Sequence, residues 1–102
     1  MPQALPHTAA RAEPPAPPPS LAVGLYRCDL QRSVTVRRIA PDRGSIVLGW
    51  LGQDHGLRSM PTSSGALRYE DPVSGLTWLV ISGKSMLLDS RRGRQLANDC
   101  RL

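Results

Sequence analysis

Two cysteines, Cys28 and Cys100, constrain the fold of this 102-residue chain more than any other feature of its sequence. They stand near the two ends of the foldable part, so a bond between them would close a loop of about 70 residues and stabilise the fold by roughly 4 kcal/mol in the chain-entropy model. Small exported domains commonly contain such bonds, because a chain of this size buries too little surface to be robust without them. We therefore expect a disulfide; the alternative is two free, buried thiols in a cytosolic protein.

Proline is concentrated at the start of the chain, where seven of the ten prolines precede position 20. The stretch from Glu13 to Ser20 has no hydrophobic period, and polyproline II is its cheapest conformation. We expect residues 1–22 to be a disordered Pro/Ala-rich spacer and residues 23–102 to be a single domain. Such a leader is what a tethered envelope protein would leave once its signal and anchor were removed, which would place a lipid anchor outside this sequence.

Beyond residue 22, short runs of alternating apolar and polar residues are separated by turn residues, which is typical of an antiparallel sheet or barrel. Val34 and Val36 should point inward from one strand, and Ile46, Leu48 and Trp50 should share one face of the next. The expected strands are 23–28, 33–37, 46–51, 57–60, 66–69, 76–81, 85–88 and 94–100, with turns at 40–44, 51–56, 71–75 and 82–84. The pattern predicts an all-β fold, a small antiparallel β-barrel of about eight short strands closed by one disulfide.

Groups that carry catalytic or metal chemistry are sparse. The sequence has no His–Cys pair, no Ser/His/Asp set with a recognised spacing and no glycine-rich phosphate loop, so we do not expect an enzyme. His7 and His55 stand alone, and two cysteines cannot complete a tetrahedral zinc site, so neither a metal nor another cofactor is expected. The longest apolar stretch, Leu76–Ile81, is far too short to cross a membrane.

The net charge of +5 comes from twelve arginines and one lysine, Lys84. A basic domain is suited to nucleic acid, an anionic surface or an acidic partner. A nucleic-acid-binding barrel would need aromatic side chains interleaved with arginine for base stacking. Tyr26, Trp50, Tyr69 and Trp78 are too few, so a basic nucleic-acid-binding barrel is kept only as an alternative.

The segment Thr62–Ala66 is a small, polar connection between two expected strands. A narrow Ser-Gly tip can enter a cleft, because it presents hydroxyl and backbone N–H groups without bulk. The alternative is an ordinary hairpin connection.

Several short motifs, taken in order, resemble the family of membrane-bound and periplasmic inhibitors of c-type lysozyme (MliC/PliC). The resemblance spans residues 23 to 101. The motifs are Tyr26-Arg27-Cys28, the loop Ser64-Gly65-Ala66-Leu67-Arg68-Tyr69, the strand of Trp78 leading through Gly83-Lys84 to Met86-Leu87-Leu88, and the terminal Cys100.

The resemblance implies an eight-stranded antiparallel barrel whose Ser-Gly loop enters the substrate cleft of c-type lysozyme, its protein partner. Retaining glycosidases, of which lysozyme is the type case, hold two carboxyl groups about 5 Å apart. A serine hydroxyl would donate to one carboxyl group and a cation would pair with the other. The residues that the resemblance assigns to lysozyme binding are Ser63, Ser64, Gly65, Arg68, Tyr69 and Lys84.

The chain departs from the family pattern at two points. Its loop has one additional residue before Tyr69, and Lys84 follows Gly83, whereas the family's lysine usually precedes this glycine. Either Lys84 or Arg68 could therefore supply the cation. The resemblance also implies a location in the bacterial periplasm or at the outer membrane, as a lipoprotein. A further alternative is an envelope lipoprotein domain that kept the fold for a structural role.

Overall fold

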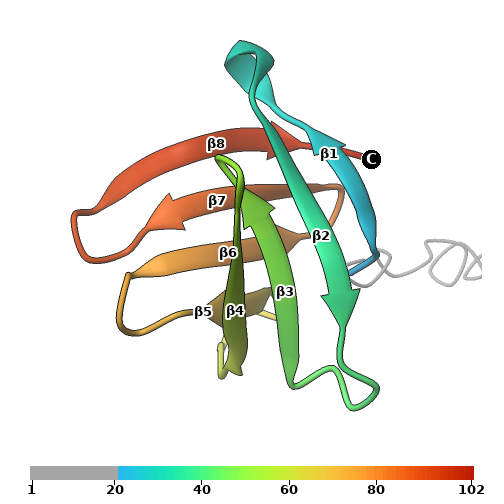
Figure 1. Cartoon of the computed structure of the whole chain (residues 1–102). Coiled ribbons are helices and arrows are strands. Elements are labelled where there is room, and N and C mark those ends of the chain that lie inside the picture. Colours follow the sequence, from blue (N-terminus) through green and yellow to red (C-terminus); the bar gives the residue numbers. More distant parts are fainter. Residues whose placement is uncertain (1–20) are drawn as a thin grey trace, which may run out of the picture.

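The computed structural model describes residues 21–102, which form one sheet of eight antiparallel strands in sequence order (Figure 1). The strands are β1 (Gly24–Arg27), β2 (Ser33–Ile39), β3 (Ser45–Trp50), β4 (Gln53–Met60), β5 (Leu67–Glu70), β6 (Leu76–Ile81), β7 (Lys84–Asp89) and β8 (Arg94–Cys100). Each strand pairs with the next along the chain, so every connection is local. The expected barrel of eight short strands is confirmed.

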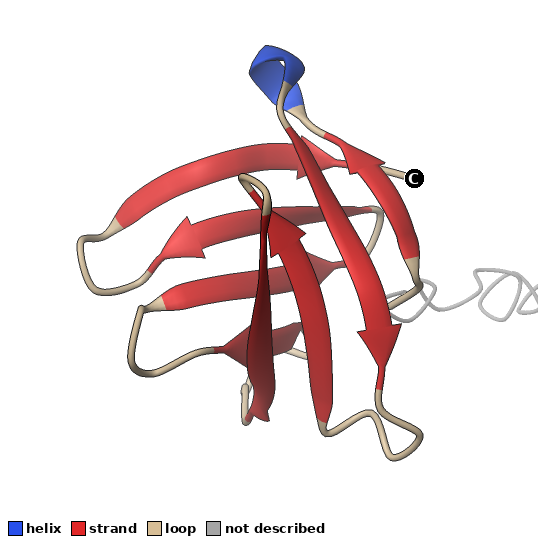
Figure 2. Ribbon diagram, viewed as in Figure 1, coloured by secondary structure: helices blue, strands red, loops and turns tan. Residues whose placement is uncertain are grey.

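The sheet curls until its two edge strands meet. Figure 2 shows β1–β4 crossing β5–β8 steeply, with the single 3-10 turn η2 (Asp29–Gln31) between β1 and β2. Between β1 and β8 the backbone makes one bridge, in which Arg27 and Arg101 exchange N–H···O bonds of 2.8 and 2.9 Å. Beside this bridge lies the Cys28–Cys100 disulfide, with a Cα–Cα distance of 4.0 Å. The expected disulfide is confirmed, and the barrel is nearly closed.

The interior is filled by the alternate residues of the strands, as the pattern of apolar and polar residues predicts. Val34, Val36, Ile46 and Leu48 are buried, while Trp50 is half-buried and packs against the core from its rim. Other core side chains come from every remaining part of the barrel: Leu21, Tyr26, Leu57, Tyr69, Leu76, Trp78, Val80, Leu87, Ala97 and Cys100. Tyr26 and Trp78 meet edge to face, with ring centroids 5.2 Å apart.

The expected domain boundary needs a correction at Leu21 and Ala22. Most of the expected spacer lies outside the described residues. Leu21, however, is 7% exposed and belongs to the core, and the hydroxyl of Tyr26 donates a 2.8 Å hydrogen bond to the carbonyl of Ala22. These two residues therefore pack on the barrel, although the sequence placed them in the spacer.

The expected turn at residues 51–56 is wrong. The turn consists of Leu51 and Gly52, and β4 begins at Gln53, which pairs with Trp50. Both turn residues have positive φ, 51° and 80°, as a two-residue type I′ hairpin requires. The polar residues that follow form a strand because β3 offers them a complete row of backbone partners.

Replacing both cysteines with alanine is expected to lower the free energy of unfolding by about 4 kcal/mol. The crosslink joins residues 72 apart in sequence and so reduces the conformational entropy of the unfolded chain. For a domain of this size the melting temperature should fall by roughly 15–30 °C. Thermal unfolding followed by circular dichroism measures the change. Reductant should lower the melting temperature of the unaltered protein and leave that of the double variant unchanged. Equal melting temperatures for the two proteins would contradict a stabilising role for the crosslink.

Candidate functional site

Three connections leave the barrel at the same end, because alternate strands of an antiparallel sheet run in the same direction. They are the β2–β3 turn (residues 40–44), the β4–β5 loop (residues 61–66) and the β6–β7 turn (residues 82–83). The small polar loop identified in the sequence is the second of these. Lys84, the lysine identified in the sequence, is the first residue of β7 and directly follows the β6–β7 turn.

The β4–β5 loop is closed on itself by side-chain hydrogen bonds. The hydroxyl of Thr62 donates to the carbonyl of Ala66 at 2.7 Å, and the Ser64 hydroxyl oxygen accepts a weak bond from the Ala66 N–H at 3.4 Å. Gly65 has a φ of +84°, and open space surrounds the position that a Cβ would take. Ser63, Ser64 and Gly65 are exposed, so the loop presents a narrow tip with hydroxyl groups. As an acceptor only, Ser64 keeps its hydroxyl proton available for another partner.

A hollow of about 340 Å³ lies beside the loop tip. It is lined by Ser64, Gly65, Ala66, Leu79, Ile81 and Ser82. Leu67 pairs with Val80, which places Ala66 opposite Ile81 at the end of the β5–β6 ladder. The loop therefore stands against the β6–β7 hairpin, with the apolar side chains of Leu79 and Ile81 between them. The sequence alone did not single out these two residues, whose place in the site follows from strand register.

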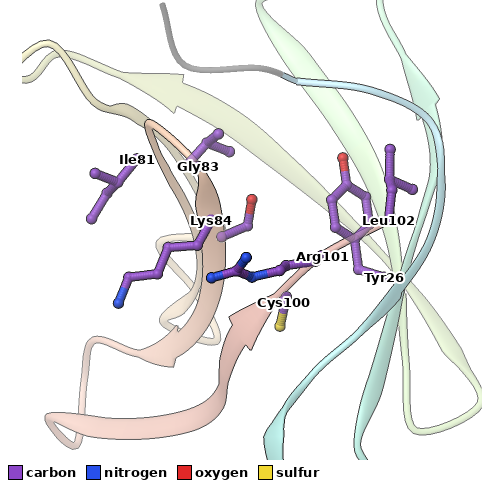
Figure 3. Close-up of a pocket in the computed structure, with 9 residues that line it drawn as sticks. Tyr26, Ile81, Gly83, Lys84, Cys100, Arg101 and Leu102 are labelled. Carbon is purple, nitrogen blue, oxygen red and sulfur yellow. The ribbon is translucent and has the colours of Figure 1, made fainter. Parts of the chain in front are cut away.

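Lys84 stands on the far side of the same hairpin. It pairs with Ile81, and directly opposite residues of a ladder share one face, so both side chains lie on the outer face of the hairpin (Figure 3). The turn between them is Ser82-Gly83, in which Gly83 adopts a φ of +89° that glycine tolerates without strain. Lys84 is exposed and has no ion pair within residues 21–102. Its strand lies about 10 Å from β5, two strand spacings away.

Arg68 lies on the outer face of β5, opposite Leu79 of β6. Its guanidinium is held by Glu70, with Nη2 and Oε1 3.2 Å apart, and the Glu70 side chain is only 16% exposed. Using Arg68 elsewhere would leave this half-buried carboxylate without its partner.

Tyr69 points the opposite way, into the barrel. Its side chain is 2% exposed, and its hydroxyl donates a 2.6 Å hydrogen bond to the carbonyl of Arg43 in the β2–β3 turn. Burial raises the pKa of Tyr69, so the hydroxyl stays protonated and remains a donor. The side chain has no face on the surface. Its contribution to the site is therefore to tie β5, which carries the loop, to a neighbouring turn.

The aromatic side chains give no platform for stacking bases. Tyr26, Tyr69 and Trp78 are buried, and Trp50 is half-buried against the core. Among residues 21–102 no group of histidine, cysteine and acidic side chains is arranged to hold a metal ion. In the same part of the chain, no helix has the length and apolarity needed to span a membrane.

Comparison with known proteins gives one match. A family model described as membrane-bound lysozyme-inhibitor of c-type lysozyme (MliC) matches residues 26–96, which run from the second half of β1 to the start of β8 and include the whole of the β4–β5 loop. No curated protein and no solved structure matches the chain.

Tyr69→Phe is expected to lower the free energy of unfolding by about 1 kcal/mol, because it removes the hydroxyl that satisfies the Arg43 carbonyl and leaves the packing of the ring unchanged. Chemical denaturation measures the change. Ser33→Ala is a suitable control, because Ser33 is exposed on β2 at the opposite end of the barrel. A Tyr69→Phe protein as stable as the control would show that this hydrogen bond does not hold β5.

Proposed function

The chain belongs to the family of membrane-bound lysozyme inhibitors of c-type lysozyme, and we propose that it blocks the enzyme by inserting the β4–β5 loop into the substrate cleft. The observation that carries this proposal is the narrow, exposed Ser-Gly tip, which stands at the same end of the barrel as Lys84, an exposed lysine with no ion pair within residues 21–102. Such an inhibitor acts by occupying the cleft and needs no covalent reaction.

Ser64 is the residue that we assign to the catalytic carboxyl groups. Retaining glycosidases carry two such groups about 5 Å apart across the scissile bond, and lysozyme is the type case. The Ser64 hydroxyl has a proton to donate, and a hydrogen bond to a carboxylate is stronger than one between neutral groups. Gly65 adds no side chain at the tip, which keeps the loop thin enough to lie between the walls of the cleft.

Lys84 is the cation that we assign to the second carboxyl group. The sequence offers two candidates, Lys84 and Arg68, and their surroundings differ. Arg68 already neutralises Glu70, a half-buried carboxylate, so its release would carry a cost. Lys84 is exposed and has no ion pair in the described part of the chain, so its ammonium group can meet a new carboxylate without giving up an old one.

The loop is held in shape before it binds. Thr62 and Ser64 bond across it to Ala66, and the strand that follows is fixed by the Tyr69 hydroxyl. A loop that is already ordered loses little conformational entropy on binding, which leaves more of the contact energy as affinity.

The family description places these inhibitors at a membrane, which points to the bacterial envelope. We propose that this protein works in the periplasm or at the outer membrane, held there by a lipid anchor. Sequencing the precursor in its native genome, followed by metabolic labelling with a fatty acid, tests this assignment.

Ser64→Ala is expected to weaken inhibition by about ten- to a hundredfold, because the variant loses one hydrogen bond to a charged carboxylate. The measurement is residual lysis of bacterial cell walls by hen egg-white lysozyme as inhibitor is titrated. Ser33→Ala, which removes an exposed hydroxyl at the far end of the barrel, should inhibit like the unaltered protein. If Ser64→Ala also does so while circular dichroism shows an intact fold, the loop is not the inhibiting element.

Lys84→Ala is expected to weaken inhibition by about tenfold or more, and Arg68→Ala is expected to have a smaller effect, because Arg68 is engaged with Glu70. The same titration compares the two, with Arg94→Ala as the matched control, since Arg94 is exposed at the start of β8. A larger loss for Arg68→Ala than for Lys84→Ala would exchange the roles. A wild-type protein that inhibits no c-type lysozyme would leave the structural-lipoprotein alternative.

A further inference from the structure

We propose that the lysozyme-binding surface continues from Lys84 along a row of three cations, Lys84, Arg101 and Arg27, and that Arg101 contacts an acidic group of the enzyme beside the catalytic pair. This inference rests on the proposed function. It adds a specificity-determining residue outside the family match, which ends at residue 96.

The register of three strands sets the row. Ser85 of β7 pairs with Cys100 of β8. Lys84 precedes Ser85 and Arg101 follows Cys100, so in this antiparallel ladder Lys84 and Arg101 are neighbours. Arg101 in turn bridges to Arg27 of β1 through two backbone hydrogen bonds. All three side chains are exposed. Because Ile81 lies between Ala66 and Lys84, the row begins beside the Ser-Gly loop and leads away from it around the barrel.

The row is unfavourable for the fold itself. Like charges placed directly opposite each other on neighbouring strands repel and destabilise the pair. Among the described residues, Asp99 is the one acidic side chain that contacts any of the three cations. One of its carboxylate oxygens lies 3.0 Å from Arg101 Nη2 and 3.1 Å from Arg101 Nε. This pair is solvent-exposed, with the Arg101 side chain 64% exposed, so it contributes little stability.

A hollow of about 230 Å³ lies next to Lys84 and Arg101 (Figure 3). Lys84 and Arg101 line it together with Tyr26, Val80 and Leu102. Two neighbouring exposed cations suit a carboxylate on a short side chain, because the guanidinium has further N–H donors beside its contact with Asp99 and the ammonium adds a second charge.

An acidic patch on the enzyme is the partner that the charges require. This domain carries a net charge of +5, and c-type lysozymes are generally basic, so the two proteins repel each other at long range. Cations in the interface then add affinity only where they meet local carboxylates. The row should therefore select lysozymes with an acidic residue on the cleft wall next to the catalytic pair.

The test compares Arg101→Gln and Arg101→Lys in the full chain with Arg94→Gln, a matched change of an exposed arginine at the other end of β8. Inhibition is titrated beside thermal melting against two c-type lysozymes, one chosen for an acidic residue on the cleft wall and one for a neutral wall. Arg101→Gln is expected to weaken inhibition of the acidic-walled enzyme by about fivefold, and Arg101→Lys to recover most of this loss. The melting temperature of Arg101→Gln should match that of the Arg94→Gln control. The variant loses the ion pair with Asp99, but it also loses the repulsion between Arg101 and its two cationic neighbours.

The outcomes separate this inference from the proposed function. Wild-type protein that fails to inhibit either lysozyme overturns both. If the wild-type protein inhibits and Arg101→Gln inhibits equally well, the proposed role of the row is overturned and the proposed function stands. Equal weakening by Arg101→Gln and Arg94→Gln also overturns it, because that result reflects net charge and not position. Arg101→Gln that loses binding to phosphatidylglycerol vesicles and retains full inhibition assigns the row to a lipid surface and overturns the lysozyme contact.

Discussion

The seam between β1 and β8 is the constraint on which the rest of the barrel depends. Neighbouring strands elsewhere share ladders of three or more residue pairs, whereas β1 and β8 share one bridge at Arg27 and Arg101. The Cys28–Cys100 bond stands beside this bridge and does covalently what the missing hydrogen bonds do not. The buried Cys100 also fixes the partner of Ser85, and through it the position of Lys84 next to Arg101. Closure of the barrel at this seam therefore also adds Arg27 to the pair formed by Lys84 and Arg101.

The strands that alternation predicts are those whose inner faces fill the core. The second and third strands follow the expected pattern at Val34, Val36, Ile46 and Leu48, because each apolar residue occupies an inward position. The start of β4 escaped prediction because Gln53 and Asp54 have low strand propensity, and the preceding Leu51 takes a left-handed conformation that leucine rarely adopts. The pairing of Gln53 and Asp54 is imposed by β3 and supported by the Arg37–Asp54 ion pair. Both are contacts with other strands, which the sequence of this short segment does not reveal.

The loop was found from sequence because its chemistry is local: small residues, hydroxyl groups and a glycine occur in one short run. The roles of its neighbours depend on register and burial, so the sequence placed Arg68, Tyr69 and Lys84 together without distinguishing them. The structure directs Tyr69 into the core, engages Arg68 with Glu70 and leaves Lys84 exposed. Arg101 had no sequence signal at all, because it stands next to Lys84 only through the register of the β7–β8 ladder.

The position of the acidic side chains affects how a basic protein can bind a basic enzyme. Asp29, Asp71 and Asp89 lie in or next to connections at the end of the barrel opposite the Ser-Gly loop. These three do not face the partner in the proposed complex, whereas Asp42 lies in the β2–β3 turn at the same end as the loop. In the proposed complex, attraction comes mainly from short-range contacts of the loop and the row. Such contacts act mainly on the rate of dissociation, whereas long-range repulsion slows association. A rigid loop suits this division, because a slow encounter is followed by tight binding only when no further ordering is needed.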